Sequence, residues 1–305
     1  MISICIPIYN FDCTDLIKSL YNQIENKKVQ IEIILMDDGS NETQLKKLEN
    51  IDKYCRFYAL EQNVGRAKIR NLLAKKATYQ NLLFIDGDSA IISNDFIADY
   101  LKIIENQPNI QVICGGSIYQ TKPPSKDFIL RWEYSRKREG KTAKQLKEQP
   151  YKSFTTNNFI IKKALFQSIQ FDERIDGYGH EDTLLGFRLM ELNSRILHVN
   201  NPVLNQDLDT NRLFLDKTEE SIHNLIEIDH FLGGNKAFRS LVPLLKTYHK
   251  LKSIGFSWML TFARKLFYTQ IRLSLEKGGV NLFFFDLYRL MQLAKIEQTK
   301  KAKYL

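Results

Sequence analysis

The sequence has 305 residues, of which 44% are hydrophobic and 26% are charged, which is ordinary usage for a globular protein. It carries a net charge of +9 and shows no internal repeat and no low-complexity linker. These features exclude repeat architectures and fit one large domain, or one domain with a sizeable appendage.

The basic charge is concentrated near the end of the sequence. Residues 236–305 hold 14 basic and three acidic side chains, a net charge of +11, which leaves −2 for the rest of the chain. The four cysteines are widely spaced and form no Cys-x-x-Cys pair, and the first residues do not resemble a signal peptide. We therefore expect buried thiols and a cytoplasmic protein.

Short apolar runs alternate with stretches of helical spacing along the first half of the chain. The apolar runs predict strands at 2–8, 31–36, 82–85 and 110–114, and the helical spacing predicts helices at 14–24 and 67–77. A further helix is predicted at 183–192. This alternation predicts a parallel sheet with helices on both faces and a ligand site beyond the carboxyl ends of the strands.

Polar residues follow three of these predicted strands. They are Pro7 to Asn10 after the first strand, Asp37 to Ser40 after the second, and Asp86-Gly87-Asp88 after a later one. A buried carboxylate without a partner is costly, and hard oxygen ligands suit Mg²⁺ or Mn²⁺. A divalent cation at Asp86 and Asp88 is therefore predicted, although Asp-Gly-Asp alone is also typical of an ordinary turn.

Five segments in this order resemble family 2 inverting glycosyltransferases of GT-A fold. They are Ile6 to Asn10, Asp37 to Ser40, Asn63 to Asn71, Phe84 to Asp88, and Gly179-His180-Glu181-Asp182. The resemblance implies a Rossmann-type mixed sheet flanked by helices over residues 1–230, with a nucleotide-binding half (1–115) and an acceptor half (116–230). Residues 231–305 are predicted to form a basic, amphipathic helical C-terminal region.

The same resemblance implies roles for individual residues. For the nucleotide sugar, expected to be a UDP-sugar, it points to Pro7, Tyr9, Asn10, Asp37, Asp38, Arg66, Arg70, Asn71, Asp86 and Gly87. For Arg66 and Arg70 two interpretations stay open, because a guanidinium suits diphosphate oxygens but also fits an exposed helix charge at Arg66 and a strand–helix ion pair at Arg70. Asn157, Tyr178, Gly179 and His180 are assigned to the acceptor or sugar.

Asp182 is the candidate general base, with Glu181 beside it. Inverting transfer needs one carboxylate that accepts the acceptor proton on the face of the sugar opposite the diphosphate. The alternative for this pair is an acidic N-terminus of the following helix. The implied reaction moves a sugar to a hydroxyl of a carbohydrate or lipid-linked acceptor in surface polysaccharide or glycolipid assembly.

A third metal ligand is not evident. Relatives with a similar pattern carry histidine after Pro-Val-x, whereas here Pro202-Val203-Leu204 is followed by Asn205. Either metal affinity is weakened, or His198 or Asp207 substitutes. His198 lies in an apolar run that is more typical of a strand histidine than of a ligand.

Aromatic and basic residues mix in the last 50 residues. The run 254–275 is interrupted by Arg264, Lys265 and Arg272, so it is not typical of a spanning helix. It fits a helix on an anionic inner-membrane surface, and the alternative is a helical appendage that packs on protein.

Two rival functions explain parts of the sequence. A nucleotidyltransferase would also use strand-end carboxylates with metal, but the segment 177–182 favours glycosyl transfer. A non-catalytic nucleic-acid-binding protein would explain the basic tail but not the aspartates, which repel phosphate unless a metal intervenes. Nucleic acid is therefore not an expected partner.

Overall fold

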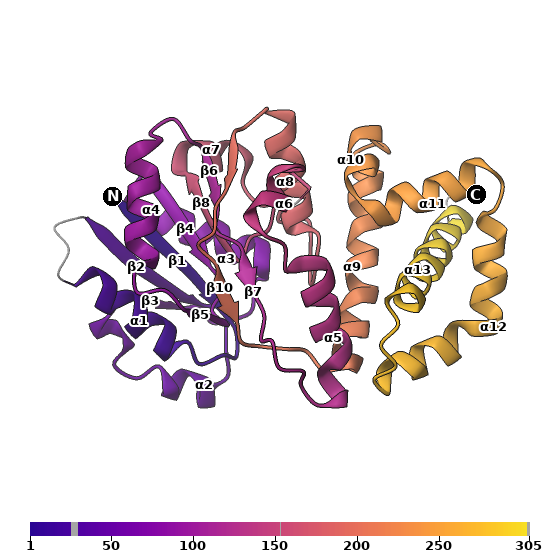
Figure 1. Ribbon diagram of the computed structural model, residues 1–305, viewed down its shortest axis with the longest axis horizontal. Helices are drawn as coiled ribbons and strands as arrows, with labels where there is room; N and C mark the ends of the chain where they lie inside the picture. Colours follow the sequence, from indigo (N-terminus) through magenta and orange to yellow (C-terminus); the bar gives the residue numbers. More distant parts are fainter. Residues whose placement is uncertain (26–29, 153, 304–305) are drawn as a thin grey trace. The chain divides into compact units, whose positions relative to one another are not determined.

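The structure, a computed structural model, describes residues 1–25, 30–152 and 154–303 (Figure 1). The chain forms two compact units. The first comprises Met1–Gln120, Glu139–Arg174 and Glu181–Asp207, and the second comprises Thr121–Arg138, Ile175–His180 and Leu208–Leu305. The predicted division at residue 230 stays a prediction.

A seven-stranded mixed sheet forms the centre of the first unit. Its spatial order is β3 (Arg56–Ala59), β2 (Ile31–Asp37), β1 (Ile2–Ile8), β4 (Asn81–Ile85), β8 (Asn158–Lys162), β6 (Val112–Cys114) and β9 (Ile196–His198). The first four strands run parallel, whereas β8 is antiparallel to both β4 and β6. The predicted parallel sheet is therefore correct for β3-β2-β1-β4 and is interrupted by β8.

Both faces of this sheet are buried because side chains alternate along each strand. In β1, Ile4 and Ile6 face one core with α1 (Thr14–Ile24) and α4 (Phe96–Asn106). Cys5 faces the other core with α3 (Arg66–Lys76), α7 (Lys163–Ile169) and α8 (Glu181–Glu191). Because both faces are buried, the strands consist of continuous runs of apolar residues in the sequence.

A smaller three-stranded sheet lies beside the polar strand ends. It pairs β5 (Ser89–Ile91), β10 (Val203–Asn205) and β7 (Ser117–Ile118), with β10 antiparallel to β5. Two short helices complete the unit, α2 (Glu42–Lys47) and α6 (Ala143–Lys147). The four cysteines are free thiols, and those at 5, 13 and 114 are buried.

The second unit is helical. It contains α5 (Ile129–Tyr134), α9 (Asn211–Phe231), α10 (Lys236–Leu241), α11 (Pro243–Ser253), α12 (Ser257–Glu276) and α13 (Leu282–Lys303). Phe214, Leu275, Phe285 and Tyr288 form the core between α9, α12 and α13. Within the described residues, every helix is too short or too polar to cross a membrane.

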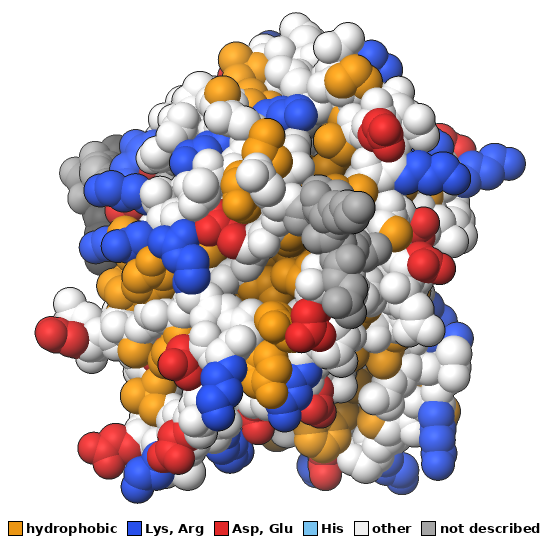
Figure 2. Space-filling view, turned by 90° about the vertical axis from the view of Figure 1, so that its left-hand side faces the viewer, with side chains coloured by type: hydrophobic (Ala, Val, Ile, Leu, Met, Phe, Trp, Pro, Cys, Tyr) orange, Lys and Arg blue, Asp and Glu red, His pale blue; other side chains and the backbone are white. Residues whose placement is uncertain are grey.

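Charged side chains are mixed on the face of the molecule that Figure 2 shows. Lys and Arg side chains lie between Asp and Glu side chains there, with hydrophobic side chains among them.

Candidate active site

The ends of β1 and β2 bring the first two predicted segments together. The N–H of Asp38 donates to the carbonyl of Ile8 at 2.8 Å. Asp37 is buried and accepts both the N–H of Ser40 (2.8 Å) and its hydroxyl. Asp37 therefore closes the turn after β2 and fixes the direction in which Asp38 leaves the strand.

Asp38 holds the loop that precedes α3. Its two carboxylate oxygens accept the backbone N–H groups of Val64 (2.7 Å) and Gly65 (3.1 Å). Burial raises the pKa of Asp38, and these two hydrogen bonds oppose that rise. Each oxygen retains a lone pair, so the carboxylate can still accept a hydrogen bond from a ligand.

Tyr9 and Asn10 follow β1 at the surface. Asn10 has a φ of 50°, and its side-chain oxygen accepts from the N–H (3.1 Å) and the amide (2.9 Å) of Asn41. This ties the turn after β1 to the turn after β2. Tyr9 is 54% exposed, and Pro7 beside it is half-buried. The tyrosine ring is thus available to a flat ligand.

Asp86-Gly87-Asp88 lies against the end of β1. A Cβ atom on Gly87 would stand 2.4 Å from Cγ2 of Ile8 and 3.0 Å from the carbonyl oxygen of Pro7. Only glycine permits this approach. The N–H of Asp86 donates to the carbonyl of Asn157 at 3.1 Å. The two aspartates are therefore held beside Pro7 and Asn157.

Asn205 faces Asp88, and sequence reasoning did not assign it to the site. β10 pairs with β5 so that Asn205 stands opposite Ser89, and the Asn205 amide lies 3.3 Å from Oδ2 of Asp88. Burial, followed by the charge of Asp86, raises the pKa of Asp88 to about 6. Among the described residues, the buried Oδ1 atoms of Asp88 and Asn205 have no hydrogen-bond partner.

These oxygen atoms fit a divalent cation. Carboxylate and amide oxygens are hard donors, and a cation would compensate the two adjacent negative charges of Asp86 and Asp88. Within the described part of the chain, no group of three or more His, Cys, Asp or Glu side chains is arranged to hold a metal. His198 is buried in β9, and its Nε2 lies 3.1 Å from the carbonyl oxygen of Pro150, as expected of a strand histidine.

Arg70 connects two of the predicted segments. Its side chain is 3% exposed, and its Nη2 lies 2.6 Å from Oδ1 of Asp86, while its Nη1 lies 3.8 Å from Oε1 of Glu181. Arg70 therefore forms an ion pair with Asp86 at the end of β4, which was one of the two interpretations of this arginine. Arg66 lies one turn away, is 48% exposed, and reaches Glu181 at 3.9 Å.

Asn71 holds a neighbouring loop. Its amide exchanges two hydrogen bonds with the backbone of Phe171, both at 3.0 Å, and donates to Glu173 at 2.9 Å. The Asn71 side chain is therefore hydrogen-bonded to other residues of the protein through both its oxygen and its nitrogen. Its assignment to the nucleotide stays a prediction.

Glu181 and Asp182 begin α8. Burial, followed by the charge of Glu181, raises the pKa of Asp182 to about 7, and Arg70 opposes this rise. Oδ1 of Asp182 accepts the N–H (2.6 Å) and the hydroxyl (3.2 Å) of Thr183. The carboxylate is therefore oriented, and its pKa lies where a base works near neutral pH.

The preceding residues belong to the second unit. The N–H of Tyr178 donates to Glu220 at 3.0 Å, and the Tyr178 ring centroid lies 5.2 Å from Nζ of Lys217. Gly179 has a φ of 98°, and a Cβ there would stand 2.5 Å from Cβ of Ser221. Burial lowers the pKa of His180 to about 3, so its imidazole is neutral.

Comparisons with known proteins identify relatives of this chain. The chain is 25% identical over 297 residues to an uncharacterized glycosyltransferase of Bacillus subtilis, YfnE. This alignment covers 77% of this chain and 74% of that protein. It is also 32% identical over 107 residues to an uncharacterized glycosyltransferase of Haemophilus influenzae. This alignment covers 34% of this chain and 42% of that protein. The match therefore spans less than half the length of the Haemophilus relative.

The solved structure of the mannosyltransferase PcManGT from Pyrobaculum calidifontis, in complex with GDP-Man and Mn²⁺, has the same fold. The TM-score is 0.53 at 13% identity, and the likeness covers 96% of this chain and 85% of that chain. The predicted α/β GT-A fold, with a central mixed sheet and C-terminal helices, is confirmed. The family model "Glycosyl transferase family 2" matches residues 3–169, more than half of the sequence, and the chain therefore belongs to glycosyl transferase family 2.

Proposed function

We propose that this protein transfers a sugar, with inversion, from a nucleotide-diphosphate sugar to a hydroxyl of a carbohydrate or lipid-linked acceptor. The observation that carries the proposal is the buried Arg70, which contacts Asp86 on one side and Glu181 on the other. This arginine joins the strand-end aspartates to the helix that presents Asp182. One site then holds both a diphosphate-binding group and a base.

The nucleoside binds at the ends of β1 and β2 in this proposal. Tyr9 offers its exposed ring to the flat face of the base, and Asp38 accepts a hydrogen bond from the edge of the base. Because Asp38 is already held by two backbone N–H groups, it needs little reorganisation to bind. UDP is the donor nucleotide that the resemblance implies.

Asp86, Asp88 and Asn205 would hold a divalent cation, Mn²⁺ or Mg²⁺. When bound, this cation would neutralise negative charge on the departing nucleoside diphosphate. The orphaned oxygens of Asp88 and Asn205 support the assignment, because a buried acceptor without a partner is costly.

Asp182 acts as the general base. It takes the proton of the acceptor hydroxyl as the acceptor oxygen bonds to the anomeric carbon and the bond from that carbon to the diphosphate oxygen breaks. The pKa of about 7 supports this role, since the carboxylate is ionised above neutral pH and is still basic enough to accept the proton. Asn157, Tyr178, Gly179 and His180 are the residues that the resemblance assigns to the acceptor or sugar.

Thermal unfolding with and without metal tests the donor site. UDP with Mn²⁺ should raise the melting temperature by several degrees, since saturation at about 100 times Kd adds about 2.7 kcal/mol. Asp88→Ala should abolish the shift, and the exposed control Asp95→Ala should keep it. An equal shift in EDTA would refute the metal assignment. If the reaction releases pyrophosphate and not a nucleoside diphosphate, the result would support a nucleotidyltransferase.

A further inference from the structure

One face of α12 is apolar and exposed. Trp258, Met259, Phe262, Leu266 and Leu273 make up this face, which we call the α12 stripe. Trp258, Phe262 and Leu266 follow one another at intervals of four residues, and Leu273 follows seven residues later, so all lie on one side of the helix. Trp258 is 64% exposed and Phe262 is 57% exposed. Large apolar side chains gathered in this way mark an interaction surface.

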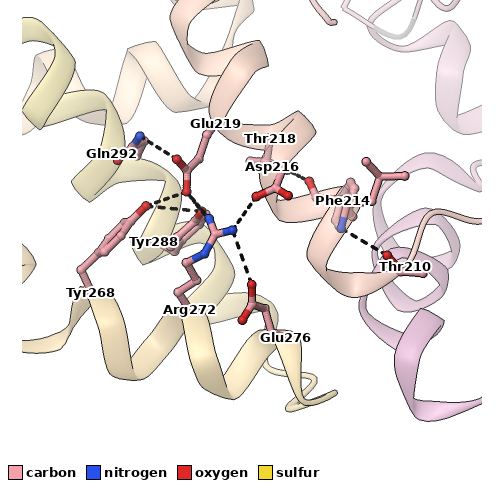
Figure 3. Close-up of polar contacts among 11 residues, drawn as sticks. Thr210, Phe214, Asp216, Thr218, Glu219, Tyr268, Arg272, Glu276, Tyr288 and Gln292 are labelled. Atoms are coloured by element: carbon pink, nitrogen blue, oxygen red, sulfur yellow. Dashed lines mark hydrogen bonds and ion pairs between the residues drawn. The ribbon is translucent and has the colours of Figure 1, made fainter.

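The opposite face of α12 is fixed inside the second unit (Figure 3). Leu260 and Leu275 are buried, and Arg272 forms an ion pair with Glu219 and donates to the hydroxyl of Tyr288 at 2.9 Å. Tyr268, also on α12, donates to the same Glu219 at 2.7 Å. These bonds set the rotation of the helix, so the α12 stripe cannot turn into the core.

The charge around the α12 stripe is positive. Lys265 lies beside the stripe and is exposed, as is Lys277 after the helix. Glu276, the one acidic residue of α12, is paired with Arg272 at 3.4 Å. A second copy of this chain would bring two such surfaces, each from a tail of net charge +11, against one another. An anionic lipid surface complements the same charge.

We propose that α12 lies in the surface of an anionic membrane, with the α12 stripe in the boundary between headgroups and acyl chains. Trp258 and Phe262 suit this depth because aromatic side chains favour the interface, and Lys265 meets the phosphate groups. The proposal goes beyond the proposed sugar transfer and does not depend on it, because the α12 stripe holds none of the residues assigned to catalysis.

Vesicle binding by the full chain tests the proposal. The protein should sediment with phosphatidylglycerol vesicles but only weakly with phosphatidylcholine vesicles, and added salt should release it. Tryptophan fluorescence gives a second readout. The chain has two tryptophans, and Trp132 is 7% exposed whereas Trp258 is 64% exposed. Binding should therefore shift the emission to the blue, and Trp258→Phe should remove that shift.

Paired variants separate insertion from other causes. Phe262→Ser with Leu266→Ser should lower the vesicle partition coefficient at least about tenfold, because each removes a large apolar side chain. Ile92→Ser with Leu192→Ser, exposed apolar residues of the first unit, is the matched control and should bind as the unchanged protein does.

Two results would overturn the proposal. One is vesicle binding that the stripe variants leave unchanged. The other is that the unchanged protein does not bind vesicles but forms a concentration-dependent dimer, measured by sedimentation velocity, and that the stripe variants do not form this dimer. Hydrolysis of the donor by the stripe variants is measured in parallel and should stay unchanged, so that failure of this proposal is distinguishable from failure of the proposed function.

Discussion

Asp182→Asn tests the chemistry most directly. Asparagine preserves the shape and the oxygen that accepts from Thr183, but it cannot take a proton. With a pKa of about 7 for Asp182, the ionised fraction rises from about 9% near pH 6 to about 91% near pH 8, so the rate of the unchanged enzyme should rise about tenfold. The variant should be slower by about 10²–10⁴-fold, and its rate should be flat across this range.

The assay is release of nucleoside diphosphate from the donor between pH 5.5 and 8.5, with donor affinity measured by thermal shift. Affinity should survive in Asp182→Asn. The matched variant is Glu181→Gln, which should move the rise in rate to lower pH because the charge of Glu181 raises the pKa of Asp182. Unaltered turnover in Asp182→Asn across the pH range, or loss of donor affinity as large as in Asp88→Ala, would refute the assignment of the base.

Protein stability provides an independent check of the same pKa. The folded pKa of Asp182 lies above the value of 3.8 expected for an aspartate in the unfolded chain. Between these two values the folded state binds more protons than the unfolded state, so ionisation of Asp182 costs stability progressively as pH rises from about 4 to about 7. Asp182→Asn removes this cost. Its melting temperature relative to the unchanged protein should therefore increase over that range.

Two further substitutions test how the site is held. Arg70→Met should cost about 3–5 kcal/mol of unfolding free energy, because it removes the buried cation that lies 2.6 Å from Asp86 and 3.8 Å from the buried Glu181. It should also move the rise in rate to higher pH, because Arg70 lowers the pKa of Asp182. The exposed Arg66→Met should cost less than about 1 kcal/mol. Gly87→Ala should destabilise the protein by about 1–3 kcal/mol through the clash with Ile8 and weaken donor affinity. The double variant with Ile8→Ala should cost less than the sum of the two single changes, and strict additivity would refute the clash.

Local patterns in the sequence predicted several elements of the first unit. The strands expected at 2–8 and 31–36 are β1 (Ile2–Ile8) and β2 (Ile31–Asp37), and the helix expected at 14–24 is α1. These succeed because side-chain periodicity reports directly on which faces are buried. The position of β8 between β4 and β6 was not predictable in this way, since it depends on pairing between segments about 75 and 45 residues apart in the chain.

The same limit applies to the site. The order of the strand-end motifs indicated which residues gather, because parallel strands end at one edge of the sheet. Asn205 was noticed only as a departure from a histidine pattern, and its contact with Asp88 follows from the register of β10 against β5. The contact between Arg70 and Glu181 likewise depends on how α3 and α8 pack on one face of the sheet.

The division of labour between the two adjacent carboxylates follows from their neighbours. Glu181 is 5% exposed and lies within 4 Å of both Arg70 and Arg66, so its carboxylate is engaged in ion pairs within the site. Asp182 has a different environment, since burial and the charge of Glu181 disfavour its ionised form and so strengthen it as a proton acceptor. Glu181 is therefore suited to position Arg70 and to tune its neighbour, and Asp182 to take the proton.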